Sequence, residues 1–586
     1  MGVYTARGAM QVLLAAALVP LGINGCHAGP QTVDAEAQHV RINQVGFLPG
    51  AQKLALVETA AQAQFRVLAD GRRKPVLEGR LEQPARWDPA GIDVAVVDLG
   101  ALAPGHYRLH VEGLPPSDPF VVDADAYGDV TMAALKAFYF NRVGMALDPA
   151  HAGQWARAAG HPDDAVLVHA SAASPGRPAG STISAPRGWY DAGDYGKYIV
   201  NSGISTWTLL AAWEHYPQFF RGRDAGIPES GDAVPDILDE TLWNLQWMLS
   251  MQDPADGGVY HKLTTLRFSG AVMPQEDTAP RYVVAKSTAA ALDFAAVMAM
   301  ASRVYAPFEA QFPGLPARMA AAGRSAWAWA LANPEVIYRQ PEDVGTGAYG
   351  DTNLEDEFAW AAAELYLLDG EAAYWDAFER HAGTPNVPSW AGVRTLGWIS
   401  LAQHLPRLPD DAARGRVSAG VLELARQLQE QEAQAAWRVA VQAEDFRWGS
   451  SSTVLNQALV MLQGYRLDGG RDLLDAAQSQ LDWVLGRNPL GVSLVTGHGL
   501  RTPMHVHHRP SQADGIEAPV PGWLSGGPNP GQQDAEECPV PYPSGLPALS
   551  WLDHDCSYAS NEVAINWNAP LVYVAAAVQA LTPKPR

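Results

Sequence analysis

The sequence has little positive charge for its size, and this scarcity narrows the classes of partner that it can bind. Its 586 residues contain 41 Lys and Arg against 63 Asp and Glu, so the formal net charge is −22 at pH 7. Nucleic acids and anionic membrane surfaces would repel such a chain. We therefore expect no nucleic-acid partner and no electrostatic attraction to a membrane, and we favour a neutral or soluble substrate.

Long hydrophobic runs are scarce as well, and the one that stands out lies near the N-terminus. Residues 12–19 are apolar and follow Arg7, but they are too few to span a bilayer as a mature helix. The run ends in Leu-Gly-Ile-Asn-Gly-Cys, which is similar to a bacterial lipoprotein signal. We predict that residues 1–26 direct export and that Cys26 is lipidated. The alternative is plain secretion, with cleavage nearby, for example after Ala28. We expect no later segment to cross a membrane.

The chain has only three cysteines, which bears on its compartment and on metal binding. An odd count in an exported protein leaves one cysteine to explain, and lipid on Cys26 would account for it. Cys538 and Cys556 would remain, eighteen positions apart in one loop-rich region. We expect a disulfide between them in an oxidising compartment. Neither belongs to a closely spaced pair, so a metal site is the poorer interpretation.

The rest of the composition is that of an ordinary globular protein. Hydrophobic residues make up 47% of the chain and charged residues 18%. The length predicts about two to four domains. The chain also has 19 Trp, which fill a large core, line a sugar-binding cleft, or do both.

Residues 38–123 have the pattern of a small β-sandwich. Short apolar segments are separated by turn signals such as Asp70-Gly71 and Pro104-Gly105, and one of these segments alternates polar with apolar residues. The predicted strands are residues 54–57, 65–68, 94–97 and 107–111. We therefore predict an all-β domain here.

From residue 126 onward the periodicity becomes helical. Several Ala-rich segments carry apolar residues at spacings of three and four, which is typical of buried helices. The clearest segments are residues 287–305, 356–368, 455–465, 472–485 and 569–581. We find no strand alternation, so residues 126–583 are predicted as a helical bundle, solenoid or toroid rather than a TIM barrel. Long loops at residues 444–453 and 488–558 are expected to carry function.

Two short segments near opposite ends of the chain combine carboxylates with aromatic residues. Asp191 and Asp194 lie three residues apart on a Gly-containing turn, and Glu562 lies beside amides and a Trp. Cleaving a glycosidic bond needs an acid for the leaving oxygen, a base for water, and flat rings that stack on sugars. The alternatives are that the two Asp residues only cap a turn and that Glu562 is only a charge at a helix N-terminus.

Three histidines occur within four residues, at His505, His507 and His508. Imidazole suits zinc, but no helical His spacing with a nearby Glu is present, and Arg509 would repel a cation. We therefore favour a hydrogen-bonding cluster over a metal centre. Direct contact with sugar hydroxyls is a third interpretation.

Four motifs together resemble those of glycoside hydrolase family 9. Residues 189–196 resemble its Asp-Ala-Gly-Asp motif, and residues 558–567 resemble its acid-containing motif. Residues 491–497, followed by residues 507–511, resemble its His-containing motif. Residues 41–47 resemble the start of the immunoglobulin-like module that precedes the catalytic domain in one subgroup. The resemblance covers nearly all of the chain after the export signal.

The resemblance implies an immunoglobulin-like sandwich at residues 38–123 and, after it, an (α/α)6 barrel that hydrolyses β-1,4-glucan with inversion. It assigns Asp194 as the general base, Asp191 as its partner in holding the water, and Glu562 as the general acid. Inversion would place the carboxyls of Glu562 and Asp194 roughly 6.5–9.5 Å apart.

The resemblance also assigns residues to the substrate and to the walls of the cleft. His507 and Arg509 would bind the sugar near the cleavage point. Tyr558 and Asp553 would support the acid side of the cleft, and Asp553 is counted with the catalytic residues. Trp189 is expected to contact the substrate.

A structural calcium ion is a further expectation from the resemblance. Residues 352–357 resemble a family calcium loop in which Asp356 and Glu357 match, and oxygen ligands suit calcium. A further Asp expected after Ser389-Trp390 is replaced by Ala391. Ordinary acids at a helix N-terminus are the alternative. No cofactor is expected to be required for activity.

We therefore predict an exported, monomeric endo-1,4-β-glucanase, with three rivals. No appended cellulose-binding module is visible, which favours soluble or amorphous glucan. An exo-acting hydrolase of cellodextrins or amino-sugar oligosaccharides would result if residues 511–555 block one end of the cleft. A non-catalytic sugar-binding surface protein would not need Asp191, Asp194 and Glu562 together. A metallohydrolase that uses the three histidines is the remaining alternative.

Overall fold

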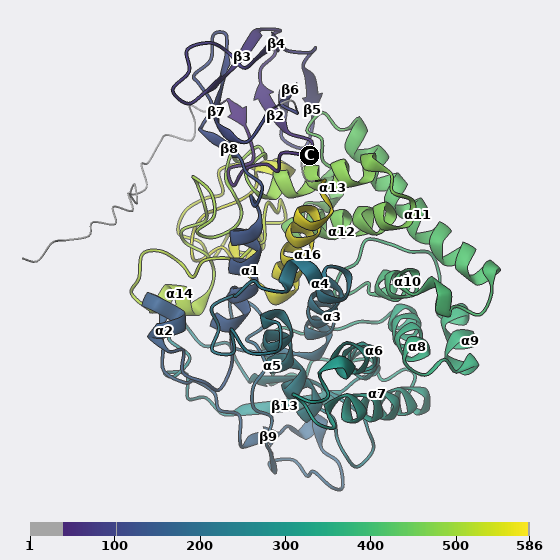
Figure 1. Ribbon diagram of the computed structural model, residues 1–586. Coiled ribbons are helices and arrows are strands. Elements are labelled where there is room, and N and C mark those ends of the chain that lie inside the picture. The colour runs from purple at the N-terminus through teal and green to yellow at the C-terminus, as the bar shows by residue number, and fades with distance from the viewer. Residues whose placement is uncertain (1–38, 101, 584–586) are drawn as a thin grey trace, which may run out of the picture. The chain divides into compact units, whose positions relative to one another are not determined.

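The computed structural model describes residues 39–100 and 102–583 (Figure 1). Residues 37–586 belong to one unit, in which a small β domain precedes a larger helical domain. The predicted export signal and Cys26 lie outside the described residues. The described chain therefore tests the two-domain prediction but not the export signal.

The β domain consists of two antiparallel four-stranded sheets. Their strand orders are β1-β2-β6-β5 and β4-β3-β7-β8. The strands are β1 (Val40–Arg41), β2 (Leu54–Glu58), β3 (Gln64–Ala69), β4 (Leu77–Arg80), β5 (Ala85–Trp87), β6 (Ile92–Asp98), β7 (Gly105–Val111) and β8 (Phe120–Val122). Apolar side chains of both sheets, such as Val97 and Leu109, share one buried core. This arrangement confirms the predicted sandwich.

Residues that follow β1 anchor the sandwich to the helical domain. The Gln44 backbone N–H donates to the Leu485 carbonyl at 2.8 Å, and the Gln44 side chain donates to the Gly491 carbonyl at 2.8 Å. Trp87 packs on Trp437 with ring centroids 5.2 Å apart. The β domain thus holds the start of the long loop region that leads to the predicted site.

Twelve helices of the helical domain form an (α/α)6 barrel. In chain order these are α1 (Gly128–Phe140), α3 (Ile199–His215), α5 (Asp236–Ser250), α6 (Thr288–Tyr305), α7 (Leu315–Ala332), α8 (Glu355–Asp369), α9 (Ala372–His381), α10 (Arg394–Gln403), α11 (Asp411–Gln434), α12 (Ser450–Asp468), α13 (Arg471–Val484) and α16 (Ile565–Leu581). Short helices α2 (Pro149–Ala152), α4 (Pro217–Phe220), α14 (Arg509–Ala513) and α15 (Tyr558–Asn561) lie in the connections. The barrel confirms the toroid that the helical pattern allowed.

The inner helices of the barrel are buried on nearly every side. Helix α3 packs against α6 and α16, α6 packs against α8, and α8 packs against α10. Helix α12 packs against α16, and α11 contacts both α10 and α12. The Ala-rich sequences of the inner helices suit this position, because small side chains let neighbouring helices approach closely. The outer helices α1, α5, α7, α9, α11 and α13 cover them.

The five helices predicted from periodicity are present with small shifts at their ends. Helix α8 ends at Asp369, one residue beyond the predicted end, and the φ of +74° at the following Gly370 suits glycine. Helix α16 begins at Ile565, four residues before the predicted start, and continues through Pro570. Proline inside a helix removes one hydrogen bond, and here the buried apolar surroundings of α16 compensate.

A five-stranded sheet within the helical domain contradicts the expectation that this region has no strands. Its order is β10-β9-β13-β12-β11. The strands are β9 (Val166–Val168), β10 (Thr182–Ile183), β11 (Lys197–Tyr198), β12 (Tyr260–Thr265) and β13 (Arg281–Lys286). Every residue of β12 is buried, including a His and a Lys, so no alternation of polar and apolar residues marks it.

Helix α6 qualifies the expectation that no later segment could cross a membrane. By length and composition alone, residues 288–308 are apolar enough to do so, with a mean hydropathy of 1.3. Within the described residues, 89% of this stretch is buried inside the protein. The helix packs between α3, α7 and α8, so its apolar character is that of a core helix.

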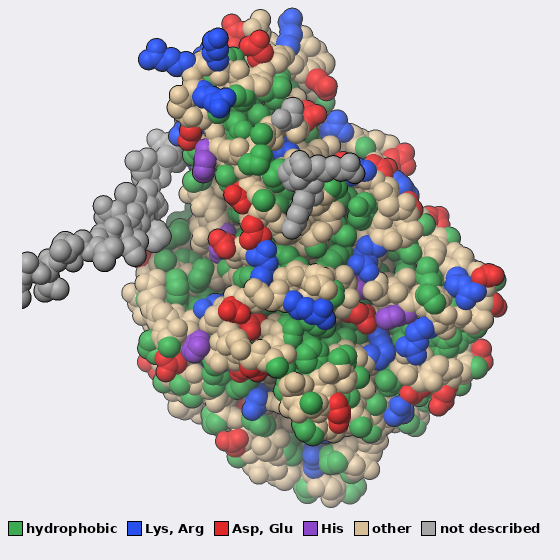
Figure 2. Space-filling view, viewed as in Figure 1, with side chains coloured by type: hydrophobic (Ala, Val, Ile, Leu, Met, Phe, Trp, Pro, Cys, Tyr) green, Lys and Arg blue, Asp and Glu red, His purple; other side chains and the backbone are tan. Residues whose placement is uncertain are grey.

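Charged side chains are interspersed on the face shown in Figure 2. Acidic and basic residues alternate there, and Lys and Arg do not gather into one large patch on that face. A nucleic-acid interface would present a concentrated basic surface.

Candidate active site

The fold brings the Asp-Ala-Gly-Asp turn and Glu562 together from opposite ends of the chain. The Gly193 N–H in this turn donates to Glu562 Oε1 at 3.3 Å. The Ile565 N–H at the start of α16 donates to the Asp191 carbonyl at 2.9 Å. The turn therefore contacts the Glu562 carboxylate directly, and the second hydrogen bond joins the two backbones.

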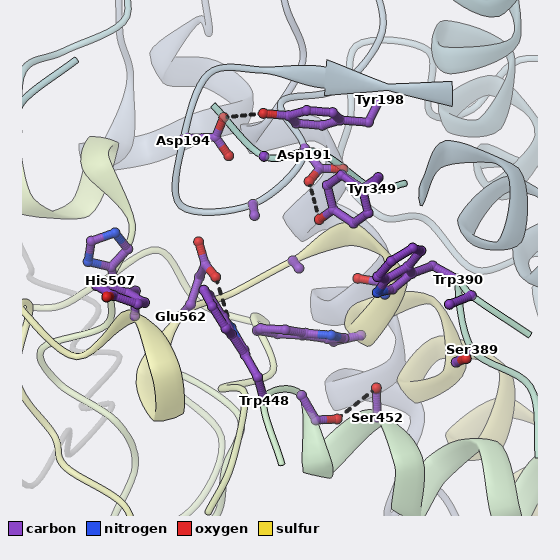
Figure 3. Close-up of a pocket in the computed structure, with 18 of the residues that line it drawn as sticks. Asp191, Asp194, Tyr198, Tyr349, Ser389, Trp390, Trp448, Ser452, His507 and Glu562 are labelled. Atoms are coloured by element: carbon purple, nitrogen blue, oxygen red, sulfur yellow. Dashed lines mark hydrogen bonds between the residues drawn. The ribbon is translucent and has the colours of Figure 1, made fainter. Parts of the chain in front are cut away.

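These carboxylates line a cleft with a volume of about 910 Å³ (Figure 3). Figure 3 shows Asp191 and Asp194 on one side of the cleft and Glu562 facing them. Aromatic residues from several loops and helices complete the walls: Tyr198, Phe268, Tyr349, Trp390, Trp448, Tyr558 and Trp567. Carboxylates opposed across an aromatic cleft provide the acid, the base and the stacking surfaces that sugar cleavage needs.

Asp191 is buried and held by two donors. Asn201 Nδ2 donates to its Oδ1 at 2.7 Å, and the Tyr349 hydroxyl donates to its Oδ2 at 2.6 Å. Burial, followed by the nearby Asp194 carboxylate, raises the pKa of Asp191 to about 8. The side chain is fixed in place and retains a proton near neutral pH.

Asp194 is also nearly buried, and its hydrogen bonds leave one oxygen available. The Gly196 N–H and the Tyr198 hydroxyl donate to its Oδ2 at 2.8 Å and 3.3 Å. Figure 3 shows the other oxygen directed toward the side on which Glu562 lies. Donors that stabilise the charged form suit a general base.

Glu562 lies in an environment that favours the protonated acid. Burial, followed by the negative charges of Asp194 and Asp191, raises its pKa well above the usual range. Trp448 Nε1 donates to Glu562 Oε2 at 3.2 Å, and the Gly193 N–H contacts the other oxygen. A carboxyl that keeps its proton at neutral pH can protonate a leaving oxygen.

Gly193 has no room for a side chain. A Cβ built at this position would lie 2.3 Å from the His507 carbonyl oxygen and 3.2 Å from Glu562 Oε1. The glycine of the motif is therefore required for the close approach of the base-side turn to the acid-side chain.

His507 and Arg509 lie at the cleft, as the motif resemblance implied. His507 Nδ1 contacts the Asp555 carbonyl at 2.7 Å, and burial, followed by the charge of Arg509, lowers the pKa of His507. Arg509 Nη1 donates to the Gly193 carbonyl at 2.8 Å. A neutral imidazole and a fixed guanidinium are suitable groups for hydrogen bonds to sugar hydroxyls.

The other two histidines of the cluster do not converge with His507. The His505 backbone N–H donates to Asp553, and its side chain is not among those that line the cleft. His508 is buried, contacts Asn141 Oδ1 at 3.1 Å, and has a pKa lowered to about 3 by burial. These positions argue against a three-histidine metal centre.

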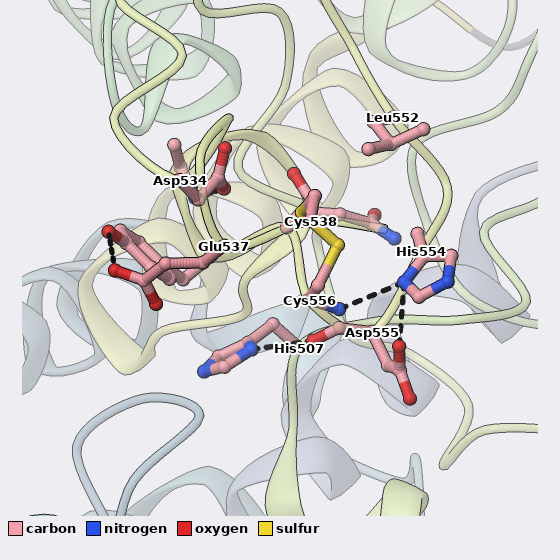
Figure 4. Close-up of a disulfide and its surroundings, with 12 residues drawn as sticks. His507, Asp534, Glu537, Cys538, Leu552, His554, Asp555 and Cys556 are labelled. Carbon is pink, nitrogen blue, oxygen red and sulfur yellow. Dashed lines mark hydrogen bonds and ion pairs between the residues drawn. A yellow bond between two sulfur atoms is a disulfide. The ribbon is translucent and has the colours of Figure 1, made fainter. Parts of the chain in front are cut away.

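A disulfide between Cys538 and Cys556 braces the acid side of the cleft (Figure 4). The two Cα atoms lie 5.3 Å apart, so the predicted pairing is present. Each cysteine is close in sequence to a residue of the cleft wall. Glu537 precedes Cys538, and the Tyr558 hydroxyl donates to Glu537 Oε1 at 3.3 Å.

Asp553 supports the acid side from behind the cleft wall. Its carboxylate accepts hydrogen bonds from the Met504 and His505 backbone N–H groups and from Asn561 Nδ2. Asn561 immediately precedes Glu562. Asp553 does not line the cleft, so its expected place among the catalytic residues is corrected to that of a positioning residue.

The expected contact of Trp189 with substrate is wrong. Trp189 has no exposed surface, and its Nε1 donates to Glu240 at 2.7 Å. Its ring packs on Phe138 with centroids 4.7 Å apart.

Sequence reasoning missed several side chains of the site. Asn201 and Tyr349, the two donors to Asp191, had no local motif that marked them. Trp448 lies in the loop at residues 444–453 that composition had marked as functional, but its contact with Glu562 depends on the fold. Trp390 was noted only as a marker of the calcium loop, yet it lines the cleft beside Tyr349.

Asp356 and Glu357 of the predicted calcium loop lie near two further buried carboxylates. The four residues are Asp293, Asp351, Asp356 and Glu357, and each has at least one buried oxygen without a hydrogen bond to the described residues. Burial raises the pKa of Asp293 and Glu357 well above the usual range, and neighbouring carboxylates raise it further. Nevertheless, no three or more His, Cys, Asp or Glu side chains in residues 39–100 and 102–583 form a group that could hold a metal ion.

Comparisons with known proteins agree with this geometry. Residues 127–575 match Glycosyl hydrolase family 9, and residues 35–115 match the Cellulase N-terminal ig-like domain. A xyloglucan-specific endo-beta-1,4-glucanase from Bacteroides ovatus is 41% identical over 558 residues, covering 92% of this chain and 94% of its own. A cellodextrinase from Butyrivibrio fibrisolvens is 30% identical over 560 residues. The match covers 91% of this chain and 98% of the cellodextrinase.

A solved structure gives the same result for the fold. The structure titled Bacteroides ovatus GH9 superposes with a TM-score of 0.87 at 40% identity, covering 93% of this chain and 99% of its own. The two family matches between them cover both domains. The chain belongs to glycosyl hydrolase family 9, as a glycoside hydrolase with an N-terminal immunoglobulin-like domain.

Proposed function

We propose that this glycoside hydrolase is an endo-1,4-β-glucanase that cleaves with inversion. The observation that carries the proposal is the opposition, across one cleft, of the protonated Glu562 and the Asp191–Asp194 pair. The endo-acting relative from Bacteroides ovatus supports it over nearly the full length of both chains. A sugar-binding protein without activity would have no use for carboxyls opposed across the cleft in this way.

The geometry supplies each proton transfer of a single displacement. Glu562 donates its proton to the leaving glycosidic oxygen while Asp194 removes a proton from the attacking water. Asp191 and its two donors hold the same water in place. After one turnover Glu562 is ionised and Asp194 is protonated, and exchange with solvent restores both. The carboxyl separation of roughly 6.5–9.5 Å that inversion needs stays a prediction.

Xyloglucan is the substrate that we propose among β-1,4-glucans. The support is the name of the relative that is 41% identical to this chain. The cleft, at about 910 Å³ and with Trp390, Trp448 and Trp567 in its walls, has space and stacking surfaces for more than one sugar ring.

Viscosity and product size, measured together, test endo action. The purified enzyme would be incubated with xyloglucan, with carboxymethylcellulose and with cellopentaose. The proposal predicts a rapid fall in viscosity and mixed oligosaccharides from xyloglucan. If the enzyme lowers the viscosity of carboxymethylcellulose but does not cleave xyloglucan, xyloglucan is rejected as the substrate and endo action is retained.

An exo-acting oligosaccharide hydrolase is the second candidate. The cellodextrinase relative favours it, as does Glu537 in the cleft wall, which comes from the loop at residues 511–555. In this case cellopentaose would release glucose or cellobiose while the viscosity of both polymers barely changed.

Calcium is proposed as a structural ion near Asp356 and Glu357, at a carboxylate cluster that does not form a ready-made metal site within the described residues. Asp293, Asp351, Asp356 and Glu357 bring unpartnered oxygens into a buried region, and such oxygens are suitable ligands for a hard cation. Binding to the folded state alone would raise the midpoint of thermal unfolding. We expect calcium to raise it by several degrees over EDTA in the wild type and not in Asp293→Asn. If the wild type has the same midpoint of thermal unfolding in calcium and in EDTA, the proposed calcium site is rejected.

Export, a lipid anchor at Cys26 and a monomeric state are also proposals. Export and the lipid anchor depend on the sequence pattern of residues 1–26, which lies outside the described residues. Mass spectrometry of the mature N-terminus would show a diacylglyceryl Cys26 if the anchor is present, and cleavage near Ala28 without lipid if it is not. Light scattering of the mature protein would measure its oligomeric state.

A further inference from the structure

Lys262 is a buried cation beside the base side of the cleft that the mechanism above does not use. It lies on β12, directly opposite Tyr198 of β11, and has no exposed surface. Its Nζ donates to the Gly347 carbonyl at 2.8 Å, to Gln340 Oε1 at 2.9 Å and to Thr346 Oγ1 at 3.2 Å. All three acceptors are neutral, and no carboxylate of the described residues forms an ion pair with it.

The carboxylate that acts on the charge of Lys262 is Asp194. Burial lowers the pKa of Lys262 to about 7, and the negative charge of Asp194 opposes this shift. Tyr198 stands between the two groups. Lys262 Nζ lies 5.7 Å from the centre of the Tyr198 ring, and the Tyr198 hydroxyl donates to Asp194 Oδ2.

The remaining titratable groups around Lys262 are neutral near pH 7. The Tyr338 ring centre lies 5.5 Å from Nζ and stacks on His261, whose pKa is lowered to about 3 by burial. Tyr349 packs on Tyr198 with ring centroids 4.7 Å apart, and burial raises its pKa well above the usual range. Below pH 7, Lys262 is therefore a positive charge among neutral neighbours.

Asp191 and Asp194 are both buried and close together, so their surroundings must favour ionisation of one over the other. Like charges in one site cannot both form without a large cost. The donors to Asp191 come from neutral side chains, Asn201 and Tyr349. A cation on the side of Asp194 favours the charge on that residue.

We propose that Lys262 is a positioning residue that keeps Asp194, rather than Asp191, in the ionised form required of the base. The proposal rests on the role of Asp194 proposed above. Lys262 acts through Tyr198 and through space, and it also holds residues 346–347, two positions before the Tyr349 that donates to Asp191.

The test is the pH dependence of kcat/KM in Lys262→Met, measured with cellopentaose or with the best soluble oligosaccharide found for the enzyme. The acidic limb reports loss of the ionised base in the free enzyme. Removing a nearby positive charge is expected to move this limb to higher pH by about one unit. A variant that has lost stability can also unfold in acid, so the folded fraction is followed by circular dichroism over the same pH range and the limb is corrected for it.

Two further variants separate charge from packing. Lys262→Arg keeps the charge and should leave the acidic limb at its wild-type position. Lys286→Met removes a lysine from the neighbouring strand β13 that pairs with Asp253 and Asp256, and it should also leave the limb unmoved. If Lys262→Met does not fold, Lys262→Gln serves the same purpose.

An unmoved limb in Lys262→Met, or equal shifts in the Met and Arg variants, would overturn the proposal. If Asp194 is not the base, a different experiment shows it: Asp194→Asn would retain near-normal turnover. The two failures are therefore distinguishable.

Discussion

The two sides of the cleft hold carboxyls in similar burial but are built differently. The base side stands on regular structure, since Asp191 and Asp194 immediately precede β11 and α3 and are held by Tyr198 and Asn201 from those elements. The acid side is built from loops. Glu562 lies between α15 and α16, against a region that the Cys538–Cys556 disulfide closes.

The comparison shows how one cleft keeps an acid and a base at the same pH. Asp194 accepts hydrogen bonds from Gly196 and Tyr198 and has Lys262 behind it, all of which favour the ionised form. Glu562 faces two negative neighbours, and burial is the largest cause of its raised pKa. Burial and the neighbouring charges together suit Glu562 to the acid role, and the donors on Asp194 suit that residue to the base role.

Removing the acid should have the largest effect. We expect Glu562→Gln to lower kcat on xyloglucan by about 10³-fold while the protein stays folded, because general acid catalysis contributes about 10²–10⁴-fold. An aryl cellobioside with a good leaving group needs little protonation and should lose far less activity. Near-normal turnover on the polysaccharide would refute the acid role.

Removing the general base should have the second largest effect on kcat. Asp194→Asn is expected to lower kcat by about 10²–10³-fold. Azide can replace the activated water, and the α-glycosyl azide formed from a β-linked substrate would identify Asp194 as the base. Rescue that yields the β-glycosyl azide would contradict a single displacement.

Asp191→Ala should cost less than Asp194→Asn, because Asp191 holds the water but does not take its proton. The change also leaves Asn201 and Tyr349 without their acceptor, so thermal unfolding must be compared in parallel. The opposite ranking, with both variants folded, would exchange the roles of the two aspartates.

Opening the disulfide tests the loop-built acid side. We expect Cys538→Ser with Cys556→Ser to raise KM several-fold with a smaller change in kcat, since Glu537 and Tyr558 would lose their brace. A matched reduction of the wild-type protein should give the same result. An unchanged KM would show that the disulfide is not needed to position Glu537 and Tyr558 in the cleft wall.

The smallest effect is expected from Trp448→Phe. Trp448 donates to Glu562, and this contact favours the ionised carboxylate, so its loss should raise the pKa of Glu562 further. Glu562 is active when protonated and is lost as pH rises, so the basic limb of kcat/KM should move to higher pH by a fraction of a unit. A shift to lower pH would show that the indole stabilises the protonated acid instead.

The sequence predicted the parts of the molecule that local pattern encodes. Strand alternation marked the sandwich, and periodicity marked inner helices such as α6 and α8. The motifs placed Asp191, Asp194, Glu562, His507 and Arg509 at one site, and each lines the cleft. Such positions are visible because the residue type and its near neighbours carry the signal.

What the sequence could not predict depends on contacts between distant segments. The buried strand β12 carries Lys262 and His261 with no alternating pattern, so the sheet behind the base went unrecognised. Trp189 was placed at the substrate because it adjoins the motif, but the turn directs it into the core. Tyr349 reaches Asp191 across 158 positions of sequence.

The anomeric form of the first product tests the central claim most directly. Proton NMR during early hydrolysis of a β-1,4-glucan oligosaccharide would distinguish the α-anomer from the β-anomer before they equilibrate. An acid at Glu562 and a water-activating base at Asp194 predict the α-anomer first. Initial release of the β-anomer would mean a covalent intermediate, and it would contradict the assignment of Asp194 as a base.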